Sequence, residues 1–185
     1  VMDAFRKHRV SDSHFAGTTG YGYDDVGRDT IDKIFADVFE AECAFARHTI
    51  TSGTHTLAIG LYGLLRPGDT MLSVTGKPYD TLEEVIGIRG EAGNGSLRDF
   101  GVNYRQIDLL PNGEIDYPAI EKALAEDKKI KMVFIQRSKG YAIRPTLSAE
   151  KIGEIAKFSH ERSDAFVVVD NCYGEFVDEH EPTYY

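Results

Sequence analysis

The chain has 185 residues and a formal net charge of −9; 42% of its residues are hydrophobic and 28% are charged. This composition is typical of a soluble globular protein, and the negative charge without a basic patch argues against a nucleic-acid partner. The longest apolar runs, Met132 to Ile135 and Ala165 to Val169, are too short to cross a bilayer, so we expect no membrane contact. Two cysteines in no metal or redox spacing, and a charged N-terminal stretch, favour a reduced, cytoplasmic setting without a metal site.

Residues 1–50 are predicted to form an N-terminal helical arm and loop segment, ahead of a main domain over residues 51–185. The first ten residues indicate a short helix, and the next stretch, rich in Gly, Ser, Thr and Tyr, indicates a loop. Tyr21 and Tyr23 lie in this loop, where two phenols on a flexible backbone fit a binding segment as well as a solvated connector. An apolar stripe at helical spacing follows, made of Ile31, Ile34, Phe35, Val38 and Phe39.

The main domain opens with a helix start at residues 51–55. Ala44 to Ile50, just before it, reads as a strand, and Thr51 or Ser52 is suited to cap the helix. Gly53 is expected to let the backbone turn tightly. The helix face that follows is apolar: Leu57, Leu61, Leu64 and Leu65. Because a helix start directs unpaired amides and the positive end of its dipole at one spot, we expect a phosphate there, although an ordinary capped helix fits the same residues.

Strands and helices then alternate to the end of the chain. The predicted strands are Thr70 to Val74, Val102 to Leu109, Lys131 to Ile135 and Ala165 to Val169, and the predicted helices follow Tyr79, the capping Asp116 and the capping Ser148. This alternation predicts an α/β fold with a mostly parallel sheet. Ligands of such sheets bind beyond the carboxyl ends of the strands, which selects Ser52 to His55, Tyr79, Gln136 to Ser138, and Asp170.

Asp170 ends the most apolar strand of the sequence. A carboxylate in this place is costly unless it is paired or hydrogen-bonded. It could hold a cation such as a protonated heteroaromatic nitrogen or a metal, it could bind a ribose hydroxyl, or neighbouring backbone amides could satisfy it. Tyr79 follows another strand, where its ring could stack on a flat ligand or simply pack. The acidic stretch from Asp178 to Glu181 is interpreted as a solvated loop rather than a metal site.

Four stretches, in this order along the chain, resemble fold type I pyridoxal-phosphate enzymes of the cystathionine and methionine lyase branch. They are residues 20–25, 51–55, 76–81 and 169–175. The chain is similar over nearly its whole length to the aluminium-resistance protein family, which is cystathionine β-lyase-like. The resemblance implies the three-layer large domain of fold type I transferases and pyridoxal 5'-phosphate as cofactor.

The resemblance also implies roles for individual residues. Gly53, Thr54 and His55 would hold the cofactor phosphate, and Tyr79 would stack on the pyridine ring. Asp170 would pair with the pyridinium nitrogen, and Ser138 or Gln136 would lie near the ring's 3-hydroxyl. In this branch a tyrosine and an arginine reach the phosphate of a neighbouring subunit, and the comparable region here holds Tyr21, Tyr23 and Arg28 at a different spacing.

The lysine that forms the Schiff base in this family comes after the aspartate, in a later strand and loop. The fifteen residues after Asp170 contain no lysine, whereas Lys77, Lys131 and Lys139 all precede it. We therefore expect an incomplete chain that carries no catalytic lysine, lacks the small C-terminal domain and is inactive alone.

For the complete protein, the resemblance implies a carbon–sulfur lyase that acts on a sulfur-containing amino acid by β- or γ-elimination, through an aldimine and a quinonoid. It also implies a homo-oligomer, because active sites in this family are shared between subunits. Two alternatives stay open. The chain could be a non-catalytic α/β scaffold that acts by binding or assembly, or another α/β enzyme that binds a nucleotide, with Asp170 on a ribose.

Overall fold

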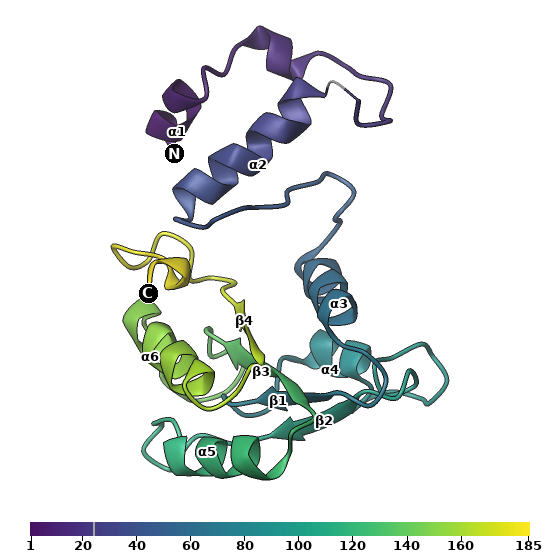
Figure 1. Ribbon diagram of the computed structural model, residues 1–185, viewed down its shortest axis with the longest axis vertical. Helices are drawn as coiled ribbons and strands as arrows, with labels where there is room; N and C mark the ends of the chain where they lie inside the picture. The colour runs from purple at the N-terminus through teal and green to yellow at the C-terminus, as the bar shows by residue number, and fades with distance from the viewer. Residues whose placement is uncertain (24) are drawn as a thin grey trace. The chain divides into compact units, whose positions relative to one another are not determined.

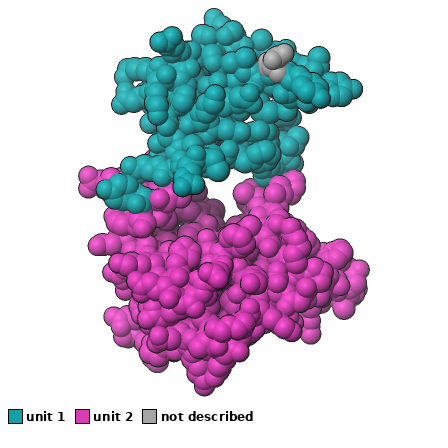
Figure 2. Space-filling view, in the orientation of Figure 1, with its two compact units in different colours: residues 1–51, 184 teal, residues 52–183, 185 magenta. Residues whose placement is uncertain are grey.

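The computed structural model describes residues 1–23 and 25–185, so Asp24, part of one stretch that carries the resemblance, lies outside the described residues. The contacts divide the chain into two compact units, shown in Figure 2. Unit 1 comprises Val1–Thr51 with Tyr184, and unit 2 comprises Ser52–Thr183 with Tyr185.

Unit 1 contains the helices α1 (Met2–Lys7) and α2 (Val26–Val38), with the 3-10 helix η1 (Asp12–Phe15) in the predicted loop between them. The Asp37 carboxylate joins α1 to α2, because it lies 2.7 Å from the Lys7 ammonium and 2.6 Å from His8 Nε2. Both helices were predicted from the sequence.

The predicted strand over Ala44 to Ile50 is wrong, since this segment is irregular. A side chain on α2 supplies the reason. The Asp32 carboxylate accepts hydrogen bonds from the Ala46 amide at 2.8 Å and from the Arg47 guanidinium at 2.7 Å. The Ala46 amide that a neighbouring strand would need is therefore already used, and the Ile50 amide closes a turn on the Arg47 carbonyl.

Unit 2 is built on a sheet of four parallel strands in the order β2-β1-β3-β4 (Figure 1). The strands are β1 (Thr70–Ser73), β2 (Asn103–Gln106), β3 (Ile130–Gln136) and β4 (Phe166–Asp170). The helices are α3 (Gly53–Leu64), α4 (Asp80–Ile86), α5 (Tyr117–Glu126) and α6 (Ala149–His160), and the 3-10 helix η2 spans Pro182–Tyr184. The predicted α/β class with a parallel sheet is confirmed.

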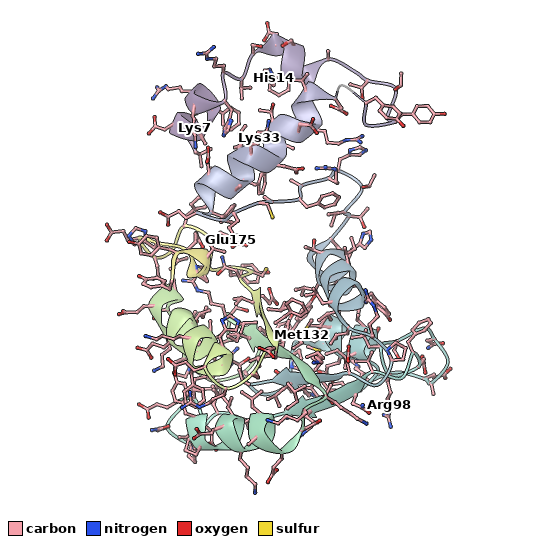
Figure 3. The ribbon with its side chains drawn as sticks, viewed as in Figure 1. Lys7, His14, Lys33, Arg98, Met132 and Glu175 are labelled. Atoms are coloured by element: carbon pink, nitrogen blue, oxygen red, sulfur yellow. The ribbon has the colours of Figure 1, made fainter. Side chains whose placement is uncertain are left out.

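Two apolar cores lie on opposite faces of this sheet. On one face, α3 and α4 pack against alternate strand residues through Leu61, Leu82, Met71, Met132 and Phe134. Met132 is labelled in the sheet in Figure 3. On the other face, α5 and α6 pack against the intervening residues through Ile120, Ile155, Leu72, Val133 and Ile135. Side chains of a strand alternate between its faces, so the two sets together make the predicted three layers.

The starts of α3, α5 and α6 were predictable from their capping residues, whereas α4 begins without a side-chain cap. The Ser52 hydroxyl accepts the His55 amide at 3.1 Å, Asp116 accepts that of Ala119 at 3.0 Å, and Ser148 accepts that of Lys151 at 3.1 Å. Each such cap stabilises its helix by about 1 kcal/mol. No helix in the described part of the chain is long and apolar enough to cross a membrane.

Strand β4 lies at an edge of the sheet and is only half-buried. It pairs with β3, from Met132 opposite Phe166 to Gln136 opposite Asp170. Phe166 is 52% exposed, whereas Asp170 at the other end of the strand is buried. The most apolar strand of the sequence is therefore not the most buried one.

Candidate functional site

The carboxyl ends of β3 and β4 place two polar side chains on the same face of the sheet. Gln136 and Asp170 are register partners on these neighbouring strands, whose spacing is roughly 4.8 Å. Each follows by two residues a side chain of the core under α3 and α4, Phe134 in β3 and Val168 in β4. Residues two apart on a strand share a face. Gln136 and Asp170 therefore lie on the side of the sheet that α3 and α4 cover.

Thr54, in the first turn of α3, is joined to this edge through Tyr79. The Thr54 hydroxyl lies 2.8 Å from the Tyr79 hydroxyl and 2.8 Å from that of Thr81. The Tyr79 amide donates a hydrogen bond of 2.9 Å to Gln136 Oε1. A continuous series of contacts thus runs from Thr54 through Tyr79 and Gln136 to Asp170, which brings together residues that are far apart in the sequence.

The start of α3 leaves backbone donors available. Ser52 Oγ accepts the His55 amide, and the Ser52 carbonyl accepts the Thr56 amide at 3.0 Å. The amides of Gly53 and Thr54, in the first turn, have no acceptor within the described residues. His55 therefore contributes its amide to the cap, and its side chain is exposed.

Gly53 does not make the tight turn expected from the sequence. Its backbone is helical and its φ is not positive, so the turn does not require glycine. A Cβ built at this position would meet no described atom within 4 Å. The space beside the Gly53 amide is therefore open, and a ligand atom can approach it closely.

Asp170 is 7% exposed, and one of its oxygens is already bound. Oδ1 accepts the Cys172 amide at 3.1 Å, whereas Oδ2 has no donor among the described residues. Burial raises the pKa of this carboxyl, the Cys172 hydrogen bond opposes the rise, and the charge of Glu175 adds to it. Figure 3 shows Glu175 in the loop after β4. The carboxylate is therefore half satisfied by backbone, and a cation at Oδ2 would offset its burial.

Gln136 and Ser138 are tied into the framework. The Gln136 amide accepts from Tyr79 at Oε1 and donates from Nε2 to the Ser138 carbonyl at 3.2 Å. The same carbonyl accepts from the Arg144 guanidinium, which also donates to the Gln136 carbonyl at 2.9 Å. Burial lowers the pKa of Arg144. Their predicted closeness to a ring hydroxyl stays a prediction.

A cavity of about 920 Å³ opens beside Tyr79 and Gln136. It is lined by the loops that follow β1, β2 and β3, and its basic lining residues are Lys77, Lys139 and Arg144. Glu83 lines it too and lies 3.2 Å from the Lys77 ammonium. Neither Thr54 nor Asp170 lines this cavity. Tyr79 and Gln136 thus belong both to the cavity lining and to the series of contacts that joins Thr54 to Asp170.

The stretch selected from the sequence, Gln136 to Ser138, includes Arg137, but sequence reasoning gave this residue no role. Arg137 is fully buried, and its guanidinium lies 2.7 Å from Asp178 and 4.0 Å from Glu181. The interpretation of residues 178–181 as a solvated loop is therefore wrong for Glu181, which is buried, whereas Asp178 is exposed although its carboxylate pairs with Arg137. A cation directly after a buried strand, with acidic residues downstream, was the signal available in the sequence.

The predicted cross-subunit residues all belong to unit 1. Tyr21 and Tyr23 are 82% and 83% exposed. Arg28 is half-buried, with its Nε 3.5 Å from the Asp25 carboxylate, the side chain that caps α2. In this chain the arginine is therefore engaged within its own unit, while both phenols are open to solvent.

The three layers, and the polar series at the carboxyl ends of the strands, define the large domain of the fold type I pyridoxal-phosphate-dependent transferases, as predicted. The structure of metB from Corynebacterium glutamicum has this fold; it is 18% identical, with a TM-score of 0.59 over 83% of this chain and 34% of its own, a likeness of fold alone. Residues 1–185 match the methionine gamma-lyase family, and the chain belongs to it.

Nearer relatives confirm the aluminium-resistance resemblance. The carbon-sulfur lyase involved in aluminum resistance from Clostridium novyi NT is 48% identical, with a TM-score of 0.93, over 99% of this chain and 43% of its own. A Bacillus cereus protein of known structure is 50% identical, with a TM-score of 0.93, over 99% and 44%. YnbB of Bacillus subtilis is 53% identical over 183 residues, 98% of this chain and 43% of its own. The chain thus spans less than half the length of these relatives.

Proposed function

We propose that unit 2 binds pyridoxal 5'-phosphate, and that the complete protein is a carbon–sulfur lyase acting on a sulfur-containing amino acid. The series of contacts from Thr54 through Tyr79 and Gln136 to Asp170 is the observation that carries the proposal. It joins an anion-binding helix start to a buried carboxylate, by way of an aromatic ring. These groups would hold the two ends and the face of a flat phosphorylated pyridine.

The start of α3 fits the phosphate. The amides of Gly53 and Thr54 and the Thr54 hydroxyl are donors, and the positive end of the helix dipole favours a dianion. The open space beside Gly53 lets an oxygen approach the backbone without meeting a side chain. His55 stays a candidate for a further hydrogen bond to the phosphate from its exposed imidazole.

The other end fits a protonated ring nitrogen. Asp170 is a largely buried residue whose Oδ2 accepts no hydrogen bond from the described residues, so a pyridinium N–H would both hydrogen-bond this oxygen and neutralise the carboxylate. When bound, the cofactor supplies an electron-withdrawing ring that stabilises negative charge at the substrate α-carbon. Asp170 keeps the ring nitrogen protonated and so maintains that property, while Tyr79 stacks on the ring and Gln136 or Ser138 lies near its 3-hydroxyl.

Two contributions come from outside unit 2. A lysine must bind the cofactor and take the α-proton, and we place it in the part of the relatives beyond the length that this chain spans. We also propose a homo-oligomer, in which the exposed Tyr21 and Tyr23, with Arg28 released from Asp25, reach the phosphate of a neighbouring subunit. The amino-acid substrate would enter beside Tyr79.

The test uses a full-length version of the protein. Added pyridoxal phosphate should give an absorption band that borohydride fixes to one lysine, and it should raise the melting temperature while nucleotides do not. Asp170→Ala should lower turnover by roughly a hundredfold or more, because it removes a charge that acts in the transition state. A full-length protein that shows no band, or that only nucleotides stabilise, would refute the cofactor assignment.

A further inference from the structure

Arg137, the residue after Gln136, is 1% exposed, although a buried cation is costly unless it is fully paired. Its guanidinium makes four hydrogen bonds. The acceptors are the Leu147 carbonyl at 3.1 Å, Asn171 Oδ1 at 2.8 Å, the Gly174 carbonyl at 2.8 Å and Asp178 Oδ2 at 2.7 Å. Three of the four belong to the loop that follows β4.

This loop, residues 171–181, surrounds the Arg137 guanidinium and is also held by hydrogen bonds between its own residues. Asp178 Oδ2 also accepts the Ala149 amide at the start of α6, at 2.7 Å. Glu181 accepts from the Asn171 side chain at 3.0 Å and from the Phe176 amide at 2.7 Å. The negative charges that compensate Arg137 are thus the same groups that set the path of the loop.

The path is one that the loop would not take by itself. Tyr173 and Phe176 have φ values of 66° and 60°, in the left-handed region that is strained for a non-glycine residue. At Gly174 a Cβ would lie 2.6 Å from Asn171 Oδ1 and would overlap the Arg137 side chain. The hydrogen bonds to Arg137 offset this strain, so the loop is expected to relax when they are lost.

The loop reaches Asp170 through Cys172. The Cys172 amide donates to Asp170 Oδ1, and Cys172 lies between Asn171 and Gly174, both of which bind Arg137. The Arg137 amide in turn donates to the Asp170 carbonyl at 3.0 Å. Arg137 therefore hydrogen-bonds to backbone carbonyls before and after Cys172, those of Asp170 and Gly174, and the Cys172 amide is the donor that orients the Asp170 carboxylate.

We infer that Arg137 is a positioning residue: it holds the loop after β4 so that the Cys172 amide fixes Oδ1 of Asp170 and leaves Oδ2 for the cofactor's ring nitrogen. The statement that Oδ2 is left for the ring nitrogen rests on the proposed function. The statement that Arg137 holds the loop and so the Cys172 amide concerns this chain alone, and it can be tested without any cofactor.

The test compares Arg137→Met with the wild type in a full-length version of the protein, without cofactor. Hydrogen exchange at the Cys172 amide should become roughly tenfold faster or more, the equivalent of one lost hydrogen bond. The ¹³C carboxyl signal of Asp170, assigned with Asp170→Asn, should titrate about 0.5 to 1 pH unit higher, because the amide that favours its charged form has left. Arg162→Met is the control, since it removes an arginine that pairs with Glu121, 2.9 Å away, outside the loop.

Arg137→Lys and Asn171→Ala keep the test decisive if Arg137→Met does not fold. Lysine retains the charge but cannot reach four acceptors, so it should move both signals in the same direction by a smaller amount. Unchanged exchange at Cys172, or an unchanged Asp170 titration, in the variants that fold would overturn the inference.

Pyridoxal phosphate then separates this inference from the proposed function. In the loaded protein, the pH midpoint of the cofactor absorption should shift in Arg137→Lys and stay in Arg162→Met. A midpoint equal to that of the wild type would restrict Arg137 to a structural role and contradict the final clause. If the wild type binds no pyridoxal phosphate, the proposed function fails, and the exchange and titration results still decide whether Arg137 positions Asp170.

Discussion

The two ends of the candidate site are built in opposite ways. At the start of α3, Ser52, Gly53 and His55 are exposed, and the amides of Gly53 and Thr54 have no acceptor among the described residues. At the end of β4, Asp170 is buried, and the following loop is packed tightly around the Arg137 guanidinium, where a Cβ at Gly174 would overlap the Arg137 side chain. The first end offers hydrogen-bond donors to a ligand from solvent, while the second holds Asp170 Oδ1 in place and leaves Oδ2 without a donor among the described residues.

The difference shows where precision is needed. A phosphate is a solvated dianion that several donors can hold in slightly different positions. A pyridinium nitrogen makes a single hydrogen bond, and a misplaced buried carboxylate would lose it altogether. Substitutions at Gly174, Gly53 and Asp170 test this difference between the two ends.

The largest effect, on the free energy of unfolding, is expected in the loop after β4. Gly174→Ala should lower the free energy of unfolding by about 1–3 kcal/mol, because its Cβ would collide with Arg137 and Asn171. Gly60→Ala in α3 is the matched control: its Cβ meets no described atom within 4 Å, and alanine favours a helix. Denaturant unfolding measures both, and equal stabilities for the two variants would show that the loop is not tightly packed.

A substitution at the start of α3 should change the affinity for pyridoxal phosphate rather than the stability. Gly53→Ala places a methyl group in the empty space beside the first-turn amides and should weaken pyridoxal phosphate binding roughly tenfold, about the effect of one hydrogen bond to a charged group. Its stability should match that of Gly60→Ala. Titration by cofactor fluorescence gives the affinity, and an unaltered value would place the phosphate elsewhere.

The smallest effect is a dependence on pH. Burial raises the pKa of Asp170 in the folded protein, so its contribution to stability is full below the ordinary carboxyl pKa and is lost as the pH rises through the raised one. Asp170→Asn carries no such charge, so its stability relative to the wild type should increase from pH 4 to neutral pH. Unfolding curves at several pH values measure this difference, and bound cofactor should abolish it.

Much of the secondary structure of unit 2 could be predicted from local signals in the sequence. Ser52, Asp116 and Ser148 act within a few residues of themselves, so the starts of their helices could be predicted from short motifs. The alternation of apolar runs then indicated the sheet, and with it the edge that carries Gln136 and Asp170.

Contacts between distant residues account for what was missed. The segment from Ala44 to Ile50 has the composition of a strand. The carboxylate of Asp32, more than ten residues earlier, accepts the Ala46 amide, so this amide is not free for pairing with another strand. Arg137 meets Asp178 and Glu181 only because parallel strands bring residues 137 and 170 together. No short motif records such a pairing.

Strand β4 has a practical consequence. Its apolar Phe166–Val169 stretch pairs with β3 on one side, and within the described strands nothing occupies the other. A bare row of amides and carbonyls beside valine side chains is a template for another chain. These 185 residues, expressed alone, should therefore tend to self-associate through this strand, and a lysine substituted for Phe166 should keep them dispersed.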